Sequence, residues 1–216
     1  MDDMPSRWIP DDDYTSRNRS AWFFTGIGYA AGGGLAASGL TPATGSAPGL
    51  VATGIAIAVL SHVYFWRPHV RVRTSGVTVV NHWRTHEVPW AALVDVETRF
   101  DLTLVTTRGM IHARGAPSPG GFASLRAGSP RSRDALSRDP SLPGVSYGPG
   151  GTLRAGDRLD SDSGGVARVI RGHWQQLVDR NALDAVDTEV RSRVDRPVVM
   201  ACTAVTVLAG LAWLID

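Results

Sequence analysis

The most constraining feature of this 216-residue chain is a run of 47 residues, 20–66, without a single Asp, Glu, Lys or Arg. A second charge-free run of 19 residues covers 197–215. The hydrocarbon core of a bilayer is about 30 Å thick and a helix rises about 1.5 Å per residue, so the shorter run is long enough for one crossing. The longer run suits two crossings joined by a turn.

The turn is visible at residues 41–48, which are small and polar and include Pro42 and Pro48. We therefore predict transmembrane helices at 21–40, 49–66 and 197–215. The first is the least apolar because it is rich in glycine. Its Gly28 and Gly32 form a small-xxx-small pair, which allows close approach of another helix.

The placement of arginine predicts the orientation of these helices. Basic residues flank the cytoplasmic ends of membrane helices. Arginines precede the first predicted helix, follow the second and precede the third: Arg17, Arg19; Arg67, Arg71, Arg73; Arg191, Arg193, Arg196. Three crossings put all of them on one side. We expect a multi-pass protein of the cell membrane with a cytoplasmic tail (1–20), a cytoplasmic middle region and an extracytoplasmic C-terminus.

Residues 67–114 show the pattern of short antiparallel strands. Val70 and Val72 alternate with arginines, and Ser75-Gly76 and Thr107-Arg108-Gly109 read as turns. Short strands with turn signals every 8–12 residues are typical of a small sandwich or barrel.

The segment 115–165 changes character, since 11 Gly, 6 Pro and 9 Ser make up about half of its 51 residues. Such a composition buries too little apolar area to offset the entropy of ordering, so we predict a disordered insertion. Beyond it, apolar residues recur at helical spacing over 166–184 and predict a helix able to close one end of the β domain. The charged residues that follow suggest that this cytoplasmic helix continues to 196.

Four segments also resemble a known family: RPHVRV (67–72), SGVTVVN (75–81), RTHEVPW (84–90) and LVDV (93–96). In this order they are similar to the short pleckstrin-homology-like (PH-like) domains of small actinobacterial membrane proteins, which directly follow a two-helix hairpin. The resemblance covers roughly 46–114. It implies a small antiparallel PH-like barrel at the membrane, and it does not imply an activity.

The candidate binding site is a group of basic side chains at the membrane-proximal start of the β domain. Arg67, His69, Arg71 and Arg73 occupy alternate positions, so they are expected on one face of a strand. Basic residues next to a membrane attract anionic lipid headgroups. The alternative is a solvated outer face that also satisfies the orientation rule.

Other polar motifs predict no catalytic or metal centre. His82 and His86 flank a turn, but strand alternation puts Glu87 on the opposite face from His86, so we expect no metal. His62 follows Ser61 without an acid in the membrane segments, and we expect it to bond a neighbouring helix or to face the cytoplasmic interface. The run Asp11-Asp12-Asp13 reads as a solvated part of a mobile tail.

The sequence therefore predicts a three-pass helical membrane protein with a small PH-like β domain and an accompanying helix. The net charge of +2 does not favour nucleic acid as a partner. We expect a non-catalytic binding or scaffolding protein without a cofactor, whose partners are the bilayer and another membrane or cytoplasmic protein; a homo-oligomer is left open. The alternatives are headgroup recognition by the arginine strand and, less favoured, a membrane enzyme that uses His62 or the pair His82 and His86.

Overall fold

The computed structural model describes residues 13–41, 47–98, 100–118, 161–183 and 188–215. The chain forms two compact units. We call residues 1–18, 69–81 and 85–192 the β unit, and residues 19–68, 82–84 and 193–216 the helical unit. Most of the predicted insertion, 119–160, lies outside the described residues.

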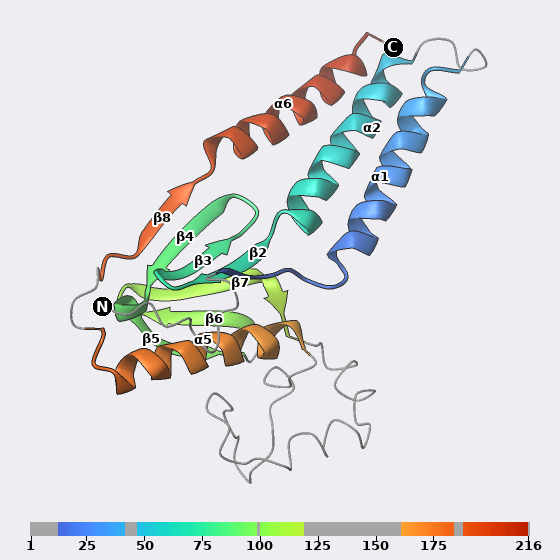
Figure 1. The fold of residues 1–216 in the computed structure, drawn as a ribbon. Helices are drawn as coiled ribbons and strands as arrows, with labels where there is room; N and C mark the ends of the chain where they lie inside the picture. The colour runs from blue at the N-terminus through green and yellow to red at the C-terminus, as the bar shows by residue number, and fades with distance from the viewer. Residues whose placement is uncertain (1–12, 42–46, 99, 119–160, 184–187, 216) are drawn as a thin grey trace, which may run out of the picture. The chain divides into compact units, whose positions relative to one another are not determined.

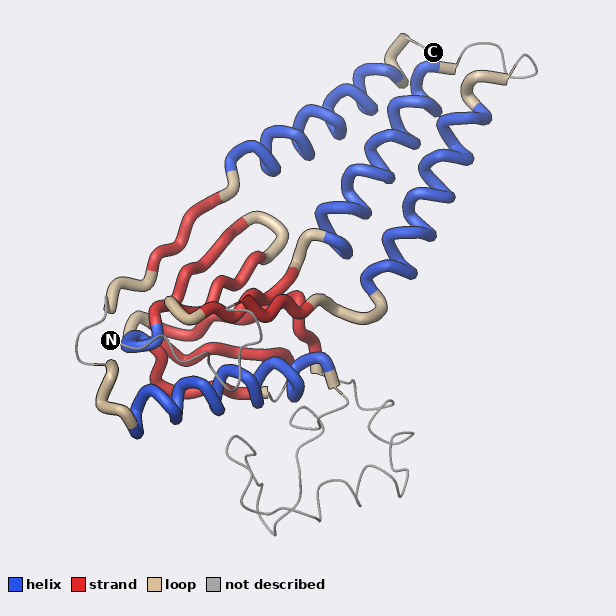
Figure 2. Tube along the Cα trace, viewed as in Figure 1, coloured by secondary structure: helices blue, strands red, loops and turns tan. Residues whose placement is uncertain are grey.

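The strands form two antiparallel sheets (Figures 1 and 2). The first has the order β1-β2-β3-β4-β8, and the second has the order β5-β6-β7. Their bounds are β1 Asp13–Ser16, β2 His69–Arg73, β3 Gly76–Val80, β4 Arg84–Pro89, β5 Leu93–Glu97, β6 Asp101–Thr106, β7 Gly109–Pro117 and β8 Arg191–Val194, and a short 3-10 turn, η3 (Trp90–Ala92), joins β4 to β5. Strands β2 to β7 match the predicted pattern.

One apolar core fills the β unit because alternate strand residues point inward. Val70 and Val72 of β2, Val77 and Val79 of β3 and Leu102 and Leu104 of β6 are almost fully buried. Helix α5 (Asp162–Asp179) contributes Val166, Ala167 and Ile170 to the same core. Figure 1 shows this helix running alongside the sheets. The predicted helix therefore does pack against the β domain.

Helix α5 differs in its bounds from the predicted helix 166–196. It begins earlier because the Ser161 hydroxyl accepts a hydrogen bond from the Gly164 N–H, 2.9 Å away, and caps the helix. It ends at Asp179, and Asn181 takes a left-handed conformation (φ 52°) that stops the helix. The predicted continuation to residue 196 is wrong, because residues 191–194 form the edge strand β8.

The N-terminal tail also differs from its prediction. Asp13 is exposed, as predicted, but Asp13–Ser16 forms strand β1 rather than part of a mobile tail; β1 pairs antiparallel with β2, Asp13 opposite Arg73 and Ser16 opposite Val70. Pairing satisfies the backbone groups of β2 that would otherwise be exposed at the sheet edge. The earlier residues of the acidic run, 11 and 12, lie outside the described residues.

The helical unit contains α1 (Ala21–Ser38), α2 (Pro48–Ser61), which continues as a π-helical turn η2 (His62–Trp66), and α6 (Arg196–Ala212). Among the described residues, Pro48–Trp66 is the one helix long and apolar enough to cross a membrane. Helix α6 is apolar but shorter, and the glycines of α1 lower its hydropathy. The predicted helix positions are therefore close to those observed, whereas the number of crossings remains a proposal.

Close glycine contacts join α1 to α2. A Cβ atom on Gly32 would lie 2.5 Å from the carbonyl oxygen of Gly54, and one on Gly28 would lie 2.0 Å from the Ser61 Oγ. Only glycine allows two helix backbones to approach this closely. The predicted small-xxx-small pair thus faces α2. Helix α6 also packs on α2, where the Trp213 indole donates a hydrogen bond to the Thr53 Oγ1 at 3.0 Å.

Candidate functional site

The structure divides the four residues that were predicted to bind lipid headgroups into two groups. His69, Arg71 and Arg73 lie on β2 at alternate positions, opposite in direction to the buried Val70 and Val72. They therefore share the outer face of the first sheet. Arg67 precedes the strand and directly follows the π-helical turn η2, so it is not part of this face.

Strand β1 brings a carboxylate to the outer arginines. The Asp13 carboxylate lies 3.8 Å from the Nε of Arg71 and 3.6 Å from the Nε of Arg73. All three side chains are about two-fifths exposed, so solvent screens these ion pairs and each contributes well under 1 kcal/mol. The face is thus basic but partly neutralised. Sequence reasoning missed this because the pairing of residues 13–16 with 70–73 is a long-range contact.

Arg67 instead contacts two other residues of the helical unit, His82 and Asp195. The Arg67 guanidinium forms an ion pair with Asp195 and donates a hydrogen bond to the His82 carbonyl at 3.0 Å. The His82 ring stacks on Tyr64 with centroids 4.3 Å apart. Because the arginine and aspartate side chains are mostly buried, this pair is screened less than those of Arg71 and Arg73.

The histidines that the sequence singled out lie in separate parts of the structure, His86 on β4 and His62 in η2. His86 and Glu87 are successive residues of β4 and so face opposite sides of the sheet. In the part of the chain that the structure describes, no group of three or more His, Cys, Asp or Glu side chains is placed to hold a metal ion. His62 forms a hydrogen bond with Tyr29 of the neighbouring helix α1. This agrees with the first of the two alternatives predicted for His62, a bond to a neighbouring helix.

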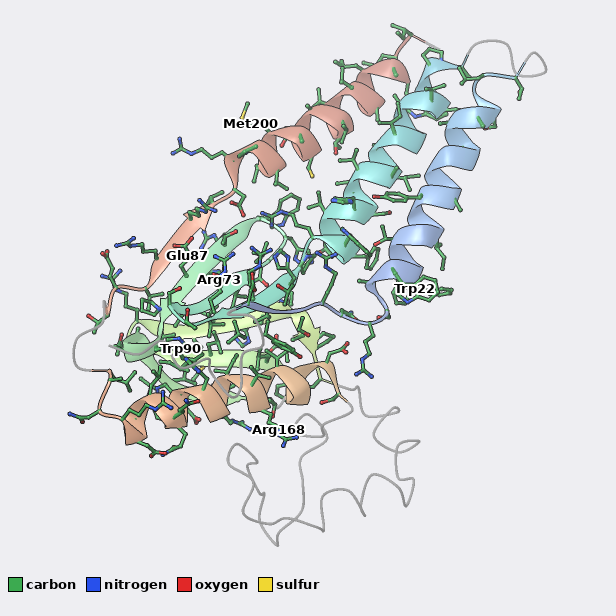
Figure 3. All side chains as sticks on the ribbon, in the orientation of Figure 1. Trp22, Arg73, Glu87, Trp90, Arg168 and Met200 are labelled. Atoms are coloured by element: carbon green, nitrogen blue, oxygen red, sulfur yellow. The ribbon has the colours of Figure 1, made fainter. Side chains whose placement is uncertain are left out.

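The β unit has a surface cavity that the sequence did not indicate. It measures about 540 Å³ and lies at the β2–β3 hairpin and the end of β4, beside the last turn of α5. Its charged lining is mixed, with Arg73 and Arg191 against Glu87 and Glu189. Figure 3 labels Arg73, Glu87 and Trp90 in this part of the β unit. A cavity with two cations and two anions does not by itself concentrate anionic ligands.

Trp90 is one of the residues that line this cavity. It is 1% exposed, and its indole N–H donates to the Arg73 and Thr74 carbonyl oxygens at 3.1 and 2.9 Å. The His173 ring of α5 packs 4.8 Å from the Trp90 ring. Burial lowers the pKa of His173 below 6.5, and the positive charge of Arg180 lowers the pKa further. His173 is therefore neutral at physiological pH and acts as a packing residue.

The β unit contains a five-stranded and a three-stranded antiparallel sheet that share one core with a following helix, as expected for a PH-like domain. Comparison with protein families agrees: residues 67–138 match the model of the bacterial PH domain. The chain thus carries a bacterial PH domain in this region, as the sequence motifs predicted. The match covers β2 to β7 and extends beyond the described residue 118. Neither the search of curated proteins nor that of solved structures gave a match.

Proposed function

We propose that this protein is a non-catalytic, three-pass protein of the cell membrane that presents its PH domain as a binding or scaffolding module at the cytoplasmic face. The bilayer is then one partner, and a membrane or cytoplasmic protein is the other. The PH domain supports the binding role. The arginines that flank the three helices support the orientation, with the C-terminus outside.

The observation that carries the membrane proposal is the surface of the helical unit. Large apolar side chains are exposed on all three helices, among them Trp22, Phe23, Ile27, Ile55, Met200, Leu208 and Leu211. Figure 3 shows Trp22 and Met200 projecting from their helices. Water-soluble proteins rarely expose apolar patches of this extent, because each Å² costs about 25 cal/mol. Contact with lipid removes that cost.

The test compares two aliphatic side chains that are equally exposed. Ile55 in the middle of α2 is 50% exposed, and Val94 on β5 is 53% exposed. If lipid covers α2, Ile55→Asp costs about 3 kcal/mol at the helix centre. The variant should then be lost from the carbonate-washed membrane fraction, whereas Val94→Asp should remain there with the wild type. Equal behaviour of both variants, or release of the wild type by carbonate, contradicts the proposal.

A second candidate function is recognition of anionic headgroups by Arg71 and Arg73. It is supported by their exposure and by the chain connection, since β2 begins three residues after the end of the predicted second crossing. Basic side chains next to a membrane contribute about 1 kcal/mol each toward anionic lipid.

Calorimetric titration tests this candidate on the full chain in detergent, with short-chain phosphatidylglycerol as the probe. The double variant Arg71→Gln/Arg73→Gln should bind more weakly than the wild type, and binding should fade with salt. Arg114→Gln is the matched control, because that arginine is exposed on another strand. Unchanged binding by the double variant removes the candidate.

A further inference from the structure

Two polar side chains meet between α1 and the start of η2, inside the segments proposed to lie in lipid. The Tyr29 hydroxyl and the His62 Nδ1 are 2.8 Å apart, and the two rings are nearly parallel, with an interplanar angle of 8°. The close contact of Gly28 with Ser61 brings the helices together at the neighbouring position. A hydrogen-bonded pair of this kind on a membrane helix is unusual, because polar groups are costly in hydrocarbon.

The pair lines a surface hollow of about 250 Å³. The other lining residues are Ala58, Val59 and Val63, so among the residues that the structure describes only Tyr29 and His62 bring polar side chains to its wall. Both side chains are exposed at the surface of the helical unit, Tyr29 to 47%. The hollow thus offers an apolar wall with one polar position, open to whatever surrounds the helices.

The Tyr29–His62 pair has one more hydrogen-bond donor than its own hydrogen bond uses. A neutral imidazole carries one N–H and a tyrosine one O–H, so the pair has two donor hydrogens. One hydrogen joins Tyr29 to His62, whichever tautomer is present. The second hydrogen is left over, on His62 Nε2 or on the Tyr29 oxygen, and within the described residues neither side chain has another hydrogen-bond partner. In lipid a donor without an acceptor is strongly disfavoured, so an acceptor from outside the chain is favoured.

We propose that this hollow binds a carbonyl oxygen carried by a lipid-soluble molecule, which accepts the remaining hydrogen while its apolar body lies along Ala58, Val59 and Val63. The inference rests on the proposed membrane location of α1 and α2. Two sources share this chemistry: the ring carbonyl of an isoprenoid quinone and the ester carbonyl of a phospholipid. Within the described part of the chain no carboxylate lines the hollow, so its wall offers nothing that favours a cationic ligand.

The first arm of the test uses the unaltered full-length protein in nanodiscs of diether phospholipid, which has no carbonyl group. Matched nanodiscs contain either diester phospholipid or diether phospholipid with a short-tailed naphthoquinone. The side-chain ¹⁵N signal of His62, assigned by its loss in His62→Gln, should shift in at least one carbonyl-containing disc. The disc that produces the shift identifies the source. An identical signal in all three discs overturns the inference.

The second arm measures quinone or diester-lipid binding by native mass spectrometry. His62→Phe and Tyr29→Phe keep an aromatic ring but remove a hydrogen-bonding group, and each should weaken binding about threefold to tenfold. Tyr64→Phe is the control, because Tyr64 is an exposed tyrosine near the same helix end that does not line the hollow. Equal loss in all three variants contradicts a specific site.

The outcome also separates this inference from the proposed function. If the wild type is released by carbonate, the membrane proposal fails and the inference fails with it. If the wild type stays in the membrane while the His62 signal responds only to formation of a dimer, the membrane proposal stands. In that case the hollow is a contact between two copies, and the carbonyl site is rejected.

Discussion

At the scale of single residues, two turn glycines with positive φ differ in their surroundings. Gly76 (φ 152°) opens β3, and a Cβ atom there would lie 2.5 Å from the Val88 carbonyl oxygen. Gly109 (φ 131°) opens β7, and a Cβ atom there would meet nothing within 4 Å. An alanine at either position is strained, but only the one at residue 76 also collides with backbone.

We therefore predict that Gly76→Ala destabilises the protein more than Gly109→Ala, by about 1–3 kcal/mol. The measurement is denaturant unfolding of the full chain in detergent micelles, followed by far-ultraviolet circular dichroism. Equal losses for the two variants would show that the contact of Gly76 with Val88 does not constrain the hairpin.

Because His173 is buried, we predict that the free energy of unfolding of the protein depends on pH. The pKa of His173 in the folded protein lies below 6.5 because burial, and then Arg180, disfavour the imidazolium form. Below pH 6.5 the unfolded chain therefore binds this proton more readily than the folded one, so the free energy of unfolding falls as the pH drops through the folded pKa. Above pH 6.5 the residue contributes no pH dependence.

The check compares unfolding temperatures above pH 6.5 and at about pH 5, where the unfolded-state imidazole is charged. The wild type should lose more stability on acidification than His173→Gln, which keeps a polar side chain but does not titrate. If the wild type and the variant lose the same stability on acidification, titratable groups other than His173 cause the loss.

At the scale of elements, the contact between α1 and α2 can be tested with adjacent glycines. A Cβ atom on Gly32 meets the Gly54 carbonyl at 2.5 Å, whereas one on Gly33 meets nothing within 4 Å. We predict that Gly32→Ala costs about 1–3 kcal/mol by overpacking. Gly33→Ala should be neutral or stabilising by about 0.5–1 kcal/mol, since alanine favours helices. Titration with sodium dodecyl sulfate gives both values, and the reverse order would contradict the observed packing.

The sequence predicted those elements whose pattern is local. Strands β2 to β7 are short runs rich in β-branched and apolar residues between clear turns, and the charge-free runs contain α1, α2 and all of α6 except its first residue, Arg196. Strands β1 and β8 were missed, because four residues such as Arg191–Val194 carry too little pattern and form a strand only when a sheet edge is available. The start of α5 was missed because Gly164 and Gly165 weaken its first turn.

The candidate site was predicted less completely than the fold, for the same reason. Because His69, Arg71 and Arg73 alternate with valines in the sequence, their position on one face of the strand was correctly predicted. No local pattern could show that Asp13 approaches two of these residues, or that Arg67 pairs with Asp195, which lies 128 positions away. Likewise, His62 was expected to bond a neighbouring helix, but its partner Tyr29 followed only from how the two helices pack.

At the scale of the whole molecule, the chain separates two kinds of surface. The helical unit exposes large apolar side chains along helices with few charges, whereas the strands of the β unit enclose an apolar core and carry charges outside. This separation explains why an average composition with 43% hydrophobic residues resembles that of an ordinary soluble protein. The proposed function therefore requires that the helices lie in lipid, with the PH domain on the cytoplasmic side.

A pair of reporter fusions tests this claim most directly. One reporter is inserted within 119–160, between β7 and α5, and the other follows Asp216. Alkaline phosphatase, which is active only outside the cytoplasm, should be active at the C-terminal position and inactive at the internal position. A fluorescent protein that folds only in the cytoplasm should give the opposite result. The same side for both positions would contradict the three-pass membrane protein.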